Sequence, residues 1–313
     1  MENRLICICG PTASGKTAFS IGLANRLQTE IISADSMQIY QGLDIGTAKA
    51  TPEEQAQAVH HMIDCVDPRE NFSVARYVEA ADACAQDILS RGMIPIVVGG
   101  TGLYLDSLIR CDDFSGEETD PAIRAHYQKM AEEQGNEAVH ACLNAVDPVS
   151  AARLHPNNLK RVIRALEVFE QTGMTIETFN AQNKRQTPKY QAVKFAVCPR
   201  ERALLYERID RRVEQMLADG LLEETKRLYE AGMLVGTAAQ AIGYKELLDY
   251  LLHNAPLDEC IALLKQRSRN YAKRQLTWFK RDPEIHWFFY DSAAELPDIL
   301  QQSTEILRSQ GIE

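Results

Sequence analysis

The sequence predicts an α/β fold in which a parallel sheet is interrupted by a helical insertion domain. Short apolar segments alternate with helical patterns over the first hundred residues, which is typical of a parallel sheet with helices on both faces. From about 115 to 189 the helical patterns continue without a convincing strand. A strand pattern then returns near residue 190, as expected of an inserted rather than an appended domain.

The predicted core begins with three short apolar strands. Between the second and third, apolar side chains recur at helical spacing from Val74 to Ile88. Ser73 can cap the start of this helix, and Arg91-Gly92 ends it. The three strands are LICIC at 5–9, EIIS at 30–33 and IPIVV at 94–98.

The insertion domain is expected at 115–189, which leaves 1–114 and 190–313 for the core. Thr119-Asp120-Pro121 opens one helix and Gly135 closes it. A second apolar stripe runs from Leu159 to Phe169 and stops at Gly173. The alternating segment 190–197 is then the strand that rejoins the sheet.

A long helix is predicted from Pro256 to Arg281, with Pro283 ending it. Apolar positions follow a 4-3 repeat from Leu257 to Trp278, and we expect Tyr271 and Trp278 in this stripe to pack in the core rather than stack on bases. The stretch 265–281 carries seven basic residues and no acidic ones, whereas the whole chain has a net charge of −10. A local basic surface on an acidic body indicates one specific anionic partner.

The 313 residues have ordinary globular composition, 45% hydrophobic and 25% charged. No apolar run approaches the roughly 20 residues needed to cross a bilayer. The eight cysteines form no CxxC pair and no zinc-spaced cluster. We expect a cytoplasmic monomer with reduced cysteines and no membrane association.

A phosphate-binding loop follows the first strand. Its glycines let backbone N–H groups approach a phosphate, and the helix that starts at its end adds a positive N-terminal field. Lys16 adds a mobile cation, and the Thr17 hydroxyl can ligate Mg²⁺. The core is therefore predicted to be P-loop NTPase-like and to bind a diphosphate or polyphosphate. The loop reads Gly10-Pro11-Thr12-Ala13-Ser14-Gly15-Lys16-Thr17 and matches G-x-x-x-x-G-K-[ST].

Other parts of an ATPase are missing from the pattern. The third strand ends in Gly99-Gly100-Thr101 instead of a metal-positioning aspartate, and no arginine-rich lid follows it. Asp35 comes just after the second strand, where an open parallel sheet faces its ligand crevice. Asp35 is therefore a candidate for the chemistry, with a surface turn or a helix cap as the alternative.

Linked motifs extend over nearly the whole chain. Together they resemble the bacterial type of tRNA dimethylallyltransferases, also called tRNA isopentenyltransferases. The pattern departs from that family at Asn158, where an acidic residue is expected. The motifs are GPTASGKT at 10, SADSMQIYQGLDIGTAK at 33, HHMID at 60, GGTGLY at 99, HPNNLKRVIRALE at 155, ERIDRRVEQM at 207, AIGYKE at 241 and AKRQLTWFKR at 272.

This resemblance implies transfer of a dimethylallyl group from dimethylallyl diphosphate to the exocyclic amine of the adenine 3′ of the anticodon, position 37, with release of diphosphate. Asp35 would be the general base. Lys16, the loop N–H groups, Mg²⁺ and Arg212 would stabilise the leaving diphosphate. Arg208, one helical turn before Arg212, is its nearest rival, and Thr101 would lie near the target nucleotide.

The resemblance also implies contacts with the tRNA anticodon stem-loop. For the basic side chains the alternative is a solvated face, for Met37 it is packing, and for Gly243 it is a helix break. The implied contacts are Asp35, Ser36, Met37 and Gln38 at the target base; Lys160, Arg161 and Arg164 in the insertion domain; Gln240, Gly243, Tyr244 and Lys245; and the stripe of Arg267, Arg274 and Arg281.

Three other functions compete with this hypothesis. A small-molecule P-loop kinase would place ATP in the loop and use Asp35 to activate an acceptor hydroxyl. A prenyltransferase for free adenine nucleotides would need neither the insertion domain nor the basic helix. A non-catalytic RNA-binding ATP switch would tolerate loss of the Asp35 carboxylate.

Overall fold

The computed structural model describes residues 3–111, 120–183 and 187–312, and the chain divides into two compact units. Unit 1 comprises Met1–Ile109 and Lys189–Glu313, and unit 2 comprises Arg110–Pro188. The expected boundary at 114/115 and the expected helix-opening Thr119 lie outside the described residues. In the described part of the chain, no helix is long and apolar enough to cross a membrane.

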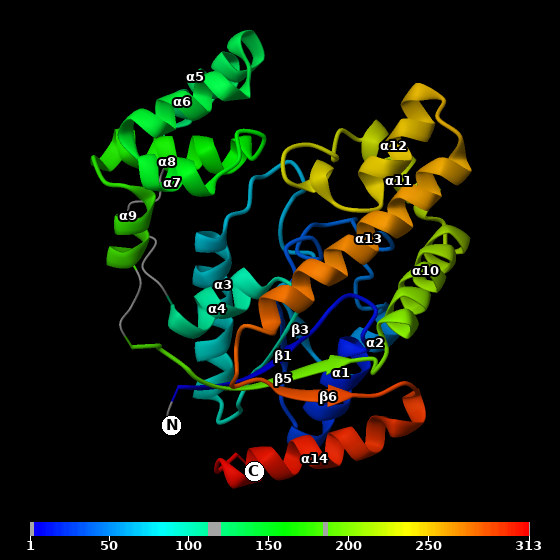
Figure 1. The fold of residues 1–313 in the computed structure, drawn as a ribbon. Helices are drawn as coiled ribbons and strands as arrows, with labels where there is room; N and C mark the ends of the chain where they lie inside the picture. The colour runs from blue at the N-terminus through cyan, green and yellow to red at the C-terminus, as the bar shows by residue number, and fades with distance from the viewer. Residues whose placement is uncertain (1–2, 112–119, 184–186, 313) are drawn as a thin grey trace. The chain divides into compact units, whose positions relative to one another are not determined.

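Unit 1 is built on a six-stranded parallel sheet with the strand order β3-β2-β4-β1-β5-β6 (Figure 1). The strands predicted near 5–9, 30–33, 94–98 and 190–197 are confirmed as β1, β2, β4 and β5. The two edge strands were not predicted, since one is only two residues long and the other carries exposed side chains. The bounds are β1 Arg4–Cys9, β2 Ile31–Ser33, β3 His60–His61, β4 Ile96–Val98, β5 Gln191–Cys198 and β6 His286–Phe289.

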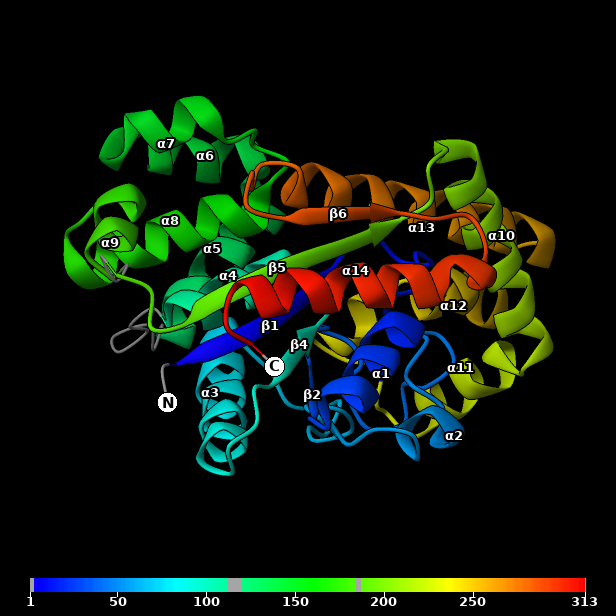
Figure 2. The ribbon, with the colours of Figure 1, turned by 90° about the horizontal axis from the view of Figure 1, so that it is seen from below.

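One face of this sheet packs against α1 (Lys16–Leu27) and α14 (Leu296–Ser309) (Figure 2). Ile6 and Ile8 of β1 point into this layer because alternate side chains of a strand share a face. They join a buried cluster with Phe19 of α1 and Leu300 of α14. The first helix α1 thus packs against apolar side chains of the sheet, and this packing fixes the position of the loop that precedes it.

The opposite face lies beneath α3 (Val74–Ser90), α4 (Gly102–Arg110) and α13 (Leu257–Phe279). Tyr77 of α3 and Tyr104 of α4 stack with ring centroids 4.0 Å apart. The predicted cap of α3 is confirmed, because the Ser73 hydroxyl accepts the Arg76 N–H, and the helix ends at Arg91 as expected. Cys7 and Cys9 are buried and free, as predicted.

The remaining helices of unit 1 cluster beyond the carboxyl ends of the strands. The predicted long helix is confirmed as α13, although it ends at Phe279, so Arg281 lies past its last turn. The other elements are α2 Pro52–Gln55, α10 Arg202–Ala218, α11 Leu221–Glu230, the short helix Ala238–Gln240, α12 Tyr244–His253 and the short helix Ala293–Glu295.

Unit 2 is entirely helical in its described residues and has its own core of Tyr127, Val139, Leu143 and their neighbours. The predicted helix starts and stops are confirmed, with Asp120 capping α5 and Gly135 and Gly173 ending α5 and α8. A fully buried Glu167 is neutralised by a bidentate Arg124. The helices are α5 Pro121–Gln134, α6 Asn136–Val146, α7 Pro148–Arg153, α8 Leu159–Thr172 and α9 Ile176–Asn183.

Candidate functional site

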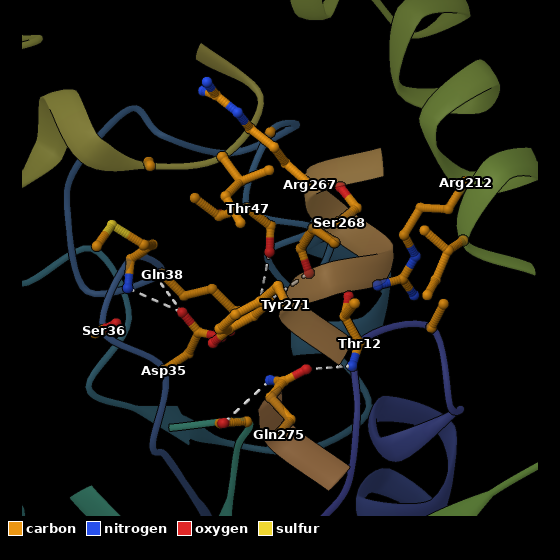
Figure 3. Close-up of a pocket in the computed structure, with 18 of the residues that line it drawn as sticks. Thr12, Asp35, Ser36, Gln38, Thr47, Arg212, Arg267, Ser268, Tyr271 and Gln275 are labelled. Carbon is orange, nitrogen blue, oxygen red and sulfur yellow. Dashed lines mark hydrogen bonds between the residues drawn. The ribbon is translucent and has the colours of Figure 1, made fainter. Parts of the chain in front are cut away.

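A cavity of about 520 Å³ opens within unit 1 at the carboxyl ends of β1, β2 and β4 (Figure 3). The loops that follow these strands form part of its wall, and α10, α13 and residues of the segment 240–245 form the rest. This edge is where open parallel sheets bind ligands. Of the residues predicted from the sequence, the cavity is lined by Thr12, Ala13, Ser14, Gly15, Lys16, Thr17, Asp35, Ser36, Met37, Gln38, Arg212, Gln240, Lys245, Arg267 and Arg274.

The phosphate loop has the backbone that anion binding requires. Gly15 caps the start of α1 at φ 93°, a left-handed conformation that favours glycine. A Cβ there would lie 1.7 Å from the Tyr290 hydroxyl, so no larger residue fits. The first turn of α1 carries no acidic side chain, and its N–H groups therefore offer an uncompensated positive end.

Two of the cations that line the cavity, Lys16 and Arg212, lie close to each other. Burial, followed by the nearby charge of Arg212, lowers the pKa of Lys16 to about 8, and Asp35 opposes this only in part. Burial also lowers the pKa of the Arg212 guanidinium. Figure 3 shows Arg212 reaching from α10 toward Thr12. No acceptor bonds this guanidinium within the described residues, so the site is a desolvated positive pocket suited to an anion.

Lys16 is held by its own loop. Its Nζ donates to the carbonyl oxygens of Gly10 at 3.0 Å and Pro11 at 2.7 Å. Gly10 and Pro11 therefore contribute to the site through their backbone carbonyls and do not line the cavity themselves. An incoming phosphate would compete for the same ammonium protons.

Asp35 lines the cavity and also shapes the turn that follows it. Its Oδ1 accepts the N–H groups of Met37 at 2.9 Å and Gln38 at 3.3 Å. Asp35 thus forms the turn that was the alternative to a chemical role, and it also lines the cavity. Oδ2 has no donor among the residues described, so this oxygen is available to accept a hydrogen bond from a ligand.

Thr101 supports the Asp35 loop from behind. Its hydroxyl accepts the Ser36 N–H at 3.2 Å, and its own N–H donates to the Ala34 carbonyl at 3.2 Å. Thr101 follows β4 and therefore ties the loops after two neighbouring strands together. Its predicted contact with the target nucleotide stays a prediction.

Arg208 has different surroundings from Arg212. It donates to the Asp291 carbonyl at 2.5 Å, and its guanidinium lies 5.6 Å from the centre of the Tyr290 ring. It lies outside the cavity lining and braces the segment that packs on Gly15. The structure therefore brings Arg212, rather than Arg208, next to Lys16.

The predicted tRNA contacts fall into several environments. Gly243 is the N-cap of α12, where φ is 111°, and Tyr244 is fully buried. Arg267 lines the cavity, but its guanidinium pairs with the buried Glu246 at 2.7 Å. Arg281 is exposed just past α13.

The insertion-domain residues predicted to contact tRNA lie on α8 of unit 2. Lys160 and Arg161 are exposed in the first turn. Arg164 is half-buried and lies 4.0 Å from Glu167. Of these three residues, only Lys160 and Arg161 therefore present an exposed cationic surface.

The expectation that Tyr271 and Trp278 are core residues is wrong. Tyr271 lines the cavity, and its ring projects from α13 toward Asp35 in Figure 3. Arg274 lies over this ring at 5.6 Å. Trp278 is 37% exposed and donates from Nε1 to Asp106 at 3.0 Å. The 4-3 stripe continues past the core and forms the cavity wall, which the repeat alone does not reveal.

Gln275 is a site residue that sequence reasoning missed. Its Oε1 accepts the Thr12 N–H at 2.8 Å, and its Nε2 donates to the Gly100 carbonyl at 3.0 Å. One buried amide thereby joins α13 to the phosphate loop and to the loop after β4. The signal was present, because Ser268 and Gln275 are polar residues in an otherwise apolar stripe.

Comparisons with known proteins agree with this geometry. Residues 38–282 match the family model described as IPP transferase, and residues 3–64 match that described as isopentenyl transferase. A tRNA dimethylallyltransferase of Geobacillus thermodenitrificans is 49% identical over 92% of this chain and 91% of its own length. That of Carboxydothermus hydrogenoformans is 46% identical over 94% of both.

Solved structures give the same result. The chain is similar to a full-length tRNA isopentenylpyrophosphate transferase from Bacillus halodurans, with TM-score 0.73 and 42% identity, covering 99% of this chain and 98% of the other. It is also similar to a eukaryotic dimethylallyltransferase described as acting on tRNA, with TM-score 0.82 and 31% identity. That match covers 99% of this chain and 79% of the other.

Proposed function

The chain belongs to the IPP transferase family, and we propose that it moves a dimethylallyl group from dimethylallyl diphosphate to the exocyclic amine of the adenine immediately 3′ of the anticodon of tRNA. The observation that carries this proposal is the pairing, in one cavity, of a phosphate loop with a carboxylate that faces it. The loop and Arg212 suit a diphosphate leaving group, and Asp35 suits an amine acceptor.

The reaction forms one C–N bond and breaks one C–O bond. The adenine N6 attacks C1 of the dimethylallyl group, and the diphosphate departs with the electron pair of the C1–O bond. The N6 proton passes to Oδ2 of Asp35, because the amine's lone pair is delocalised and needs a base as the bond forms. Asp35 holds the required orientation because its Oδ1 is fixed by two backbone N–H groups.

The leaving diphosphate gains negative charge as the bond breaks. Arg212 and the N–H groups at the start of α1 are already in place to bind it, so their contribution requires little reorganisation. Displacement of the Gly10 and Pro11 carbonyls would turn the Lys16 ammonium toward the phosphate. Tyr271 and the Asp35 loop lie on the acceptor side of the cavity.

The site also fits Mg²⁺ as a companion of the diphosphate. Thr17 and Asp35 line the cavity with hard oxygen donors, and Mg²⁺ is usually held by one or two protein oxygens together with substrate phosphates. The described residues contain no group of three His, Cys, Asp or Glu that could hold a metal alone. Thr17 would be its ligand, and the ion would neutralise charge on the diphosphate.

The acceptor is proposed to be the anticodon stem-loop of a tRNA, bound by a protein that acts as a monomer. The exposed cations Lys160 and Arg161 of unit 2, and Lys245 and Arg274 at the cavity of unit 1, can contact phosphates. A base of the anticodon loop must leave its stack to enter a cavity of this size.

The decisive experiment supplies labelled dimethylallyl diphosphate or labelled ATP, each with bulk tRNA. We expect label in tRNA only from dimethylallyl diphosphate, located by nucleoside mass analysis at the adenine next to the anticodon. ATP turnover without labelled tRNA would favour a P-loop kinase. Labelling of free adenosine monophosphate as efficiently as tRNA would favour a nucleotide prenyltransferase.

A further inference from the structure

A buried carboxylate outside the cavity holds one of its walls. Glu224 of α11 is only 5% exposed. Its two carboxylate oxygens accept the backbone N–H of Ile45 at 3.0 Å and 3.1 Å. They also accept the backbone N–H of Gly46 at 3.2 Å and the Tyr244 hydroxyl at 2.7 Å. A carboxylate is costly to bury unless donors surround it, and here a distant loop and Tyr244 supply them, with the Arg227 guanidinium 3.9 Å away.

The loop held by Glu224 borders the cavity directly. Gly46, Thr47 and Ala48 all line it. The carbonyl oxygens of Thr47 and Ala48 accept from Nε2 of Gln38 at 3.2 Å and 3.1 Å, and Gln38 lines the cavity as well. Figure 3 shows Gln38 and Thr47 on the same side as Asp35. The amide of Gln38 is thus oriented by a loop that Glu224 anchors.

This orientation limits what Gln38 can offer a ligand. An amide whose NH₂ group is engaged by two carbonyls can present only its Oε1, which is an acceptor. This oxygen accepts the Ser33 hydroxyl at 3.4 Å and keeps a second lone pair for a ligand. An acceptor suits the amino group of a base and opposes a base carbonyl. Loss of the loop's position would free the amide to turn and would remove this preference.

Tyr244 completes the anchor. Its ring packs so closely on Gly46 that a Cβ there would lie 2.5 Å from a ring carbon. Burial and then the Glu224 charge raise the pKa of Tyr244, which keeps its hydroxyl protonated and donating. The loop therefore cannot shift without breaking the contacts of both residues.

We propose that Glu224 and Tyr244 are positioning residues for the tRNA acceptor, which fix the 44–48 loop and, through the Thr47 and Ala48 carbonyls, the amide of Gln38. The inference rests on the proposed function, since the ligand on this side of the cavity is the tRNA base. The phosphate loop on the other side does not depend on this anchor.

The test compares Glu224→Gln with Glu223→Gln, which loses the same charge from an exposed position on the same helix. The KM values for an anticodon stem-loop and for dimethylallyl diphosphate, kcat and the melting temperature are measured. We expect the KM for the stem-loop to rise about tenfold in Glu224→Gln, because several hydrogen bonds to a charged acceptor are weakened. The KM for dimethylallyl diphosphate and all constants of Glu223→Gln should stay within about twofold of the wild type.

Tyr244→Phe keeps the ring and removes one donor, so it carries the same test if Glu224→Gln does not fold. A double-mutant cycle with Gln38→Ala then asks whether Glu224 acts through Gln38, in which case the two effects on the stem-loop KM are not additive. Equal changes in both KM values, or a lower melting temperature with unchanged KM values, would overturn the inference. A wild-type protein that fails to label tRNA would instead refute the proposed function.

Discussion

At the scale of single residues, two arginines one helical turn apart on α10 have been given different surroundings. Arg212 lines the cavity beside Lys16, whereas Arg208 bonds the Asp291 carbonyl and lies over Tyr290. The sequence motif contains both and does not separate them, because each side chain's direction depends on which element packs against that helical face.

Substitution of each arginine by glutamine should therefore have different consequences. For Arg212→Gln we expect kcat/KM for dimethylallyl diphosphate to fall about 10- to 100-fold, since a charge-assisted contact with the leaving group is lost. For Arg208→Gln we expect a melting temperature lower by a few degrees and kcat/KM within about threefold. Steady-state kinetics with calorimetry separates the two, and equal kinetic losses would contradict the assignment.

Asp35 is expected to be needed for proton removal but not for the shape of its loop. In Asp35→Asn the amide oxygen can still accept the Met37 and Gln38 N–H groups. We expect transfer to fall by about 10²- to 10⁴-fold while stem-loop binding stays unchanged. Single-turnover rates and a binding titration measure the two quantities. A variant with normal transfer would eliminate Asp35 as the base.

The pKa of about 8 at Lys16 predicts how diphosphate binding depends on pH. The ammonium form binds the ligand, and the ligand in turn raises this pKa, so binding takes up a proton above pH 8. Affinity should fall about tenfold between pH 7 and pH 9, where the Lys16 side chain of the free protein is largely neutral. Titration of dimethylallyl diphosphate at both pH values tests this. Lys16→Arg should show a flatter profile, because arginine stays charged.

At the scale of elements, α13 combines two roles that its sequence pattern did not distinguish. The helix itself, its approximate length and its apolar repeat were predicted correctly. Its burial was not, because Ser268, Tyr271 and Gln275 occupy stripe positions that face the cavity. A 4-3 repeat reports that a helix face is covered, but it does not say whether a core or a ligand covers it.

The buried amide of Gln275 links α13 to the phosphate loop, and the contribution of this link to stability can be measured. In Gln275→Met the Thr12 N–H and the Gly100 carbonyl lose their partner, which should cost about 1 to 3 kcal/mol of folding free energy. The phosphate loop should also loosen and bind dimethylallyl diphosphate more weakly. Gln266→Met, an exposed change of the same chemistry on α13, is the control for denaturant unfolding and ligand titration. Indistinguishable midpoints for the two variants would show that the link is dispensable.

Short elements were predictable only where their sequence was distinctive. The phosphate loop and the four inner strands follow from local pattern. The strand His60–His61 does not, since it is two residues long and pairs only at the sheet edge. The anchor of the loop 44–48 could not be predicted either, because Glu224 is about 180 residues away in the chain.

At the scale of the whole molecule, the net charge is an average over the chain and does not reveal local basic surfaces. The net charge of −10 suggests repulsion of nucleic acid, yet cations are concentrated on α13 and on the first turn of α8. Local charge density decides which anionic partner can bind, because screening limits the reach of distant charges to about 10 Å. The sequence could show this concentration, but it could not show that Arg267 is already neutralised by Glu246.

The two units should be separable. The Tyr190 N–H donates to the Ile109 carbonyl at 3.1 Å, so the two ends of unit 1 that flank unit 2 in the sequence are joined by a hydrogen bond. Replacing residues 110–188 with a short glycine-rich linker should leave unit 1 folded, with affinity for dimethylallyl diphosphate within about threefold of the wild type. The KM for the stem-loop should rise more than tenfold, since Lys160 and Arg161 are removed. An unchanged KM for the stem-loop would exclude unit 2 from tRNA binding.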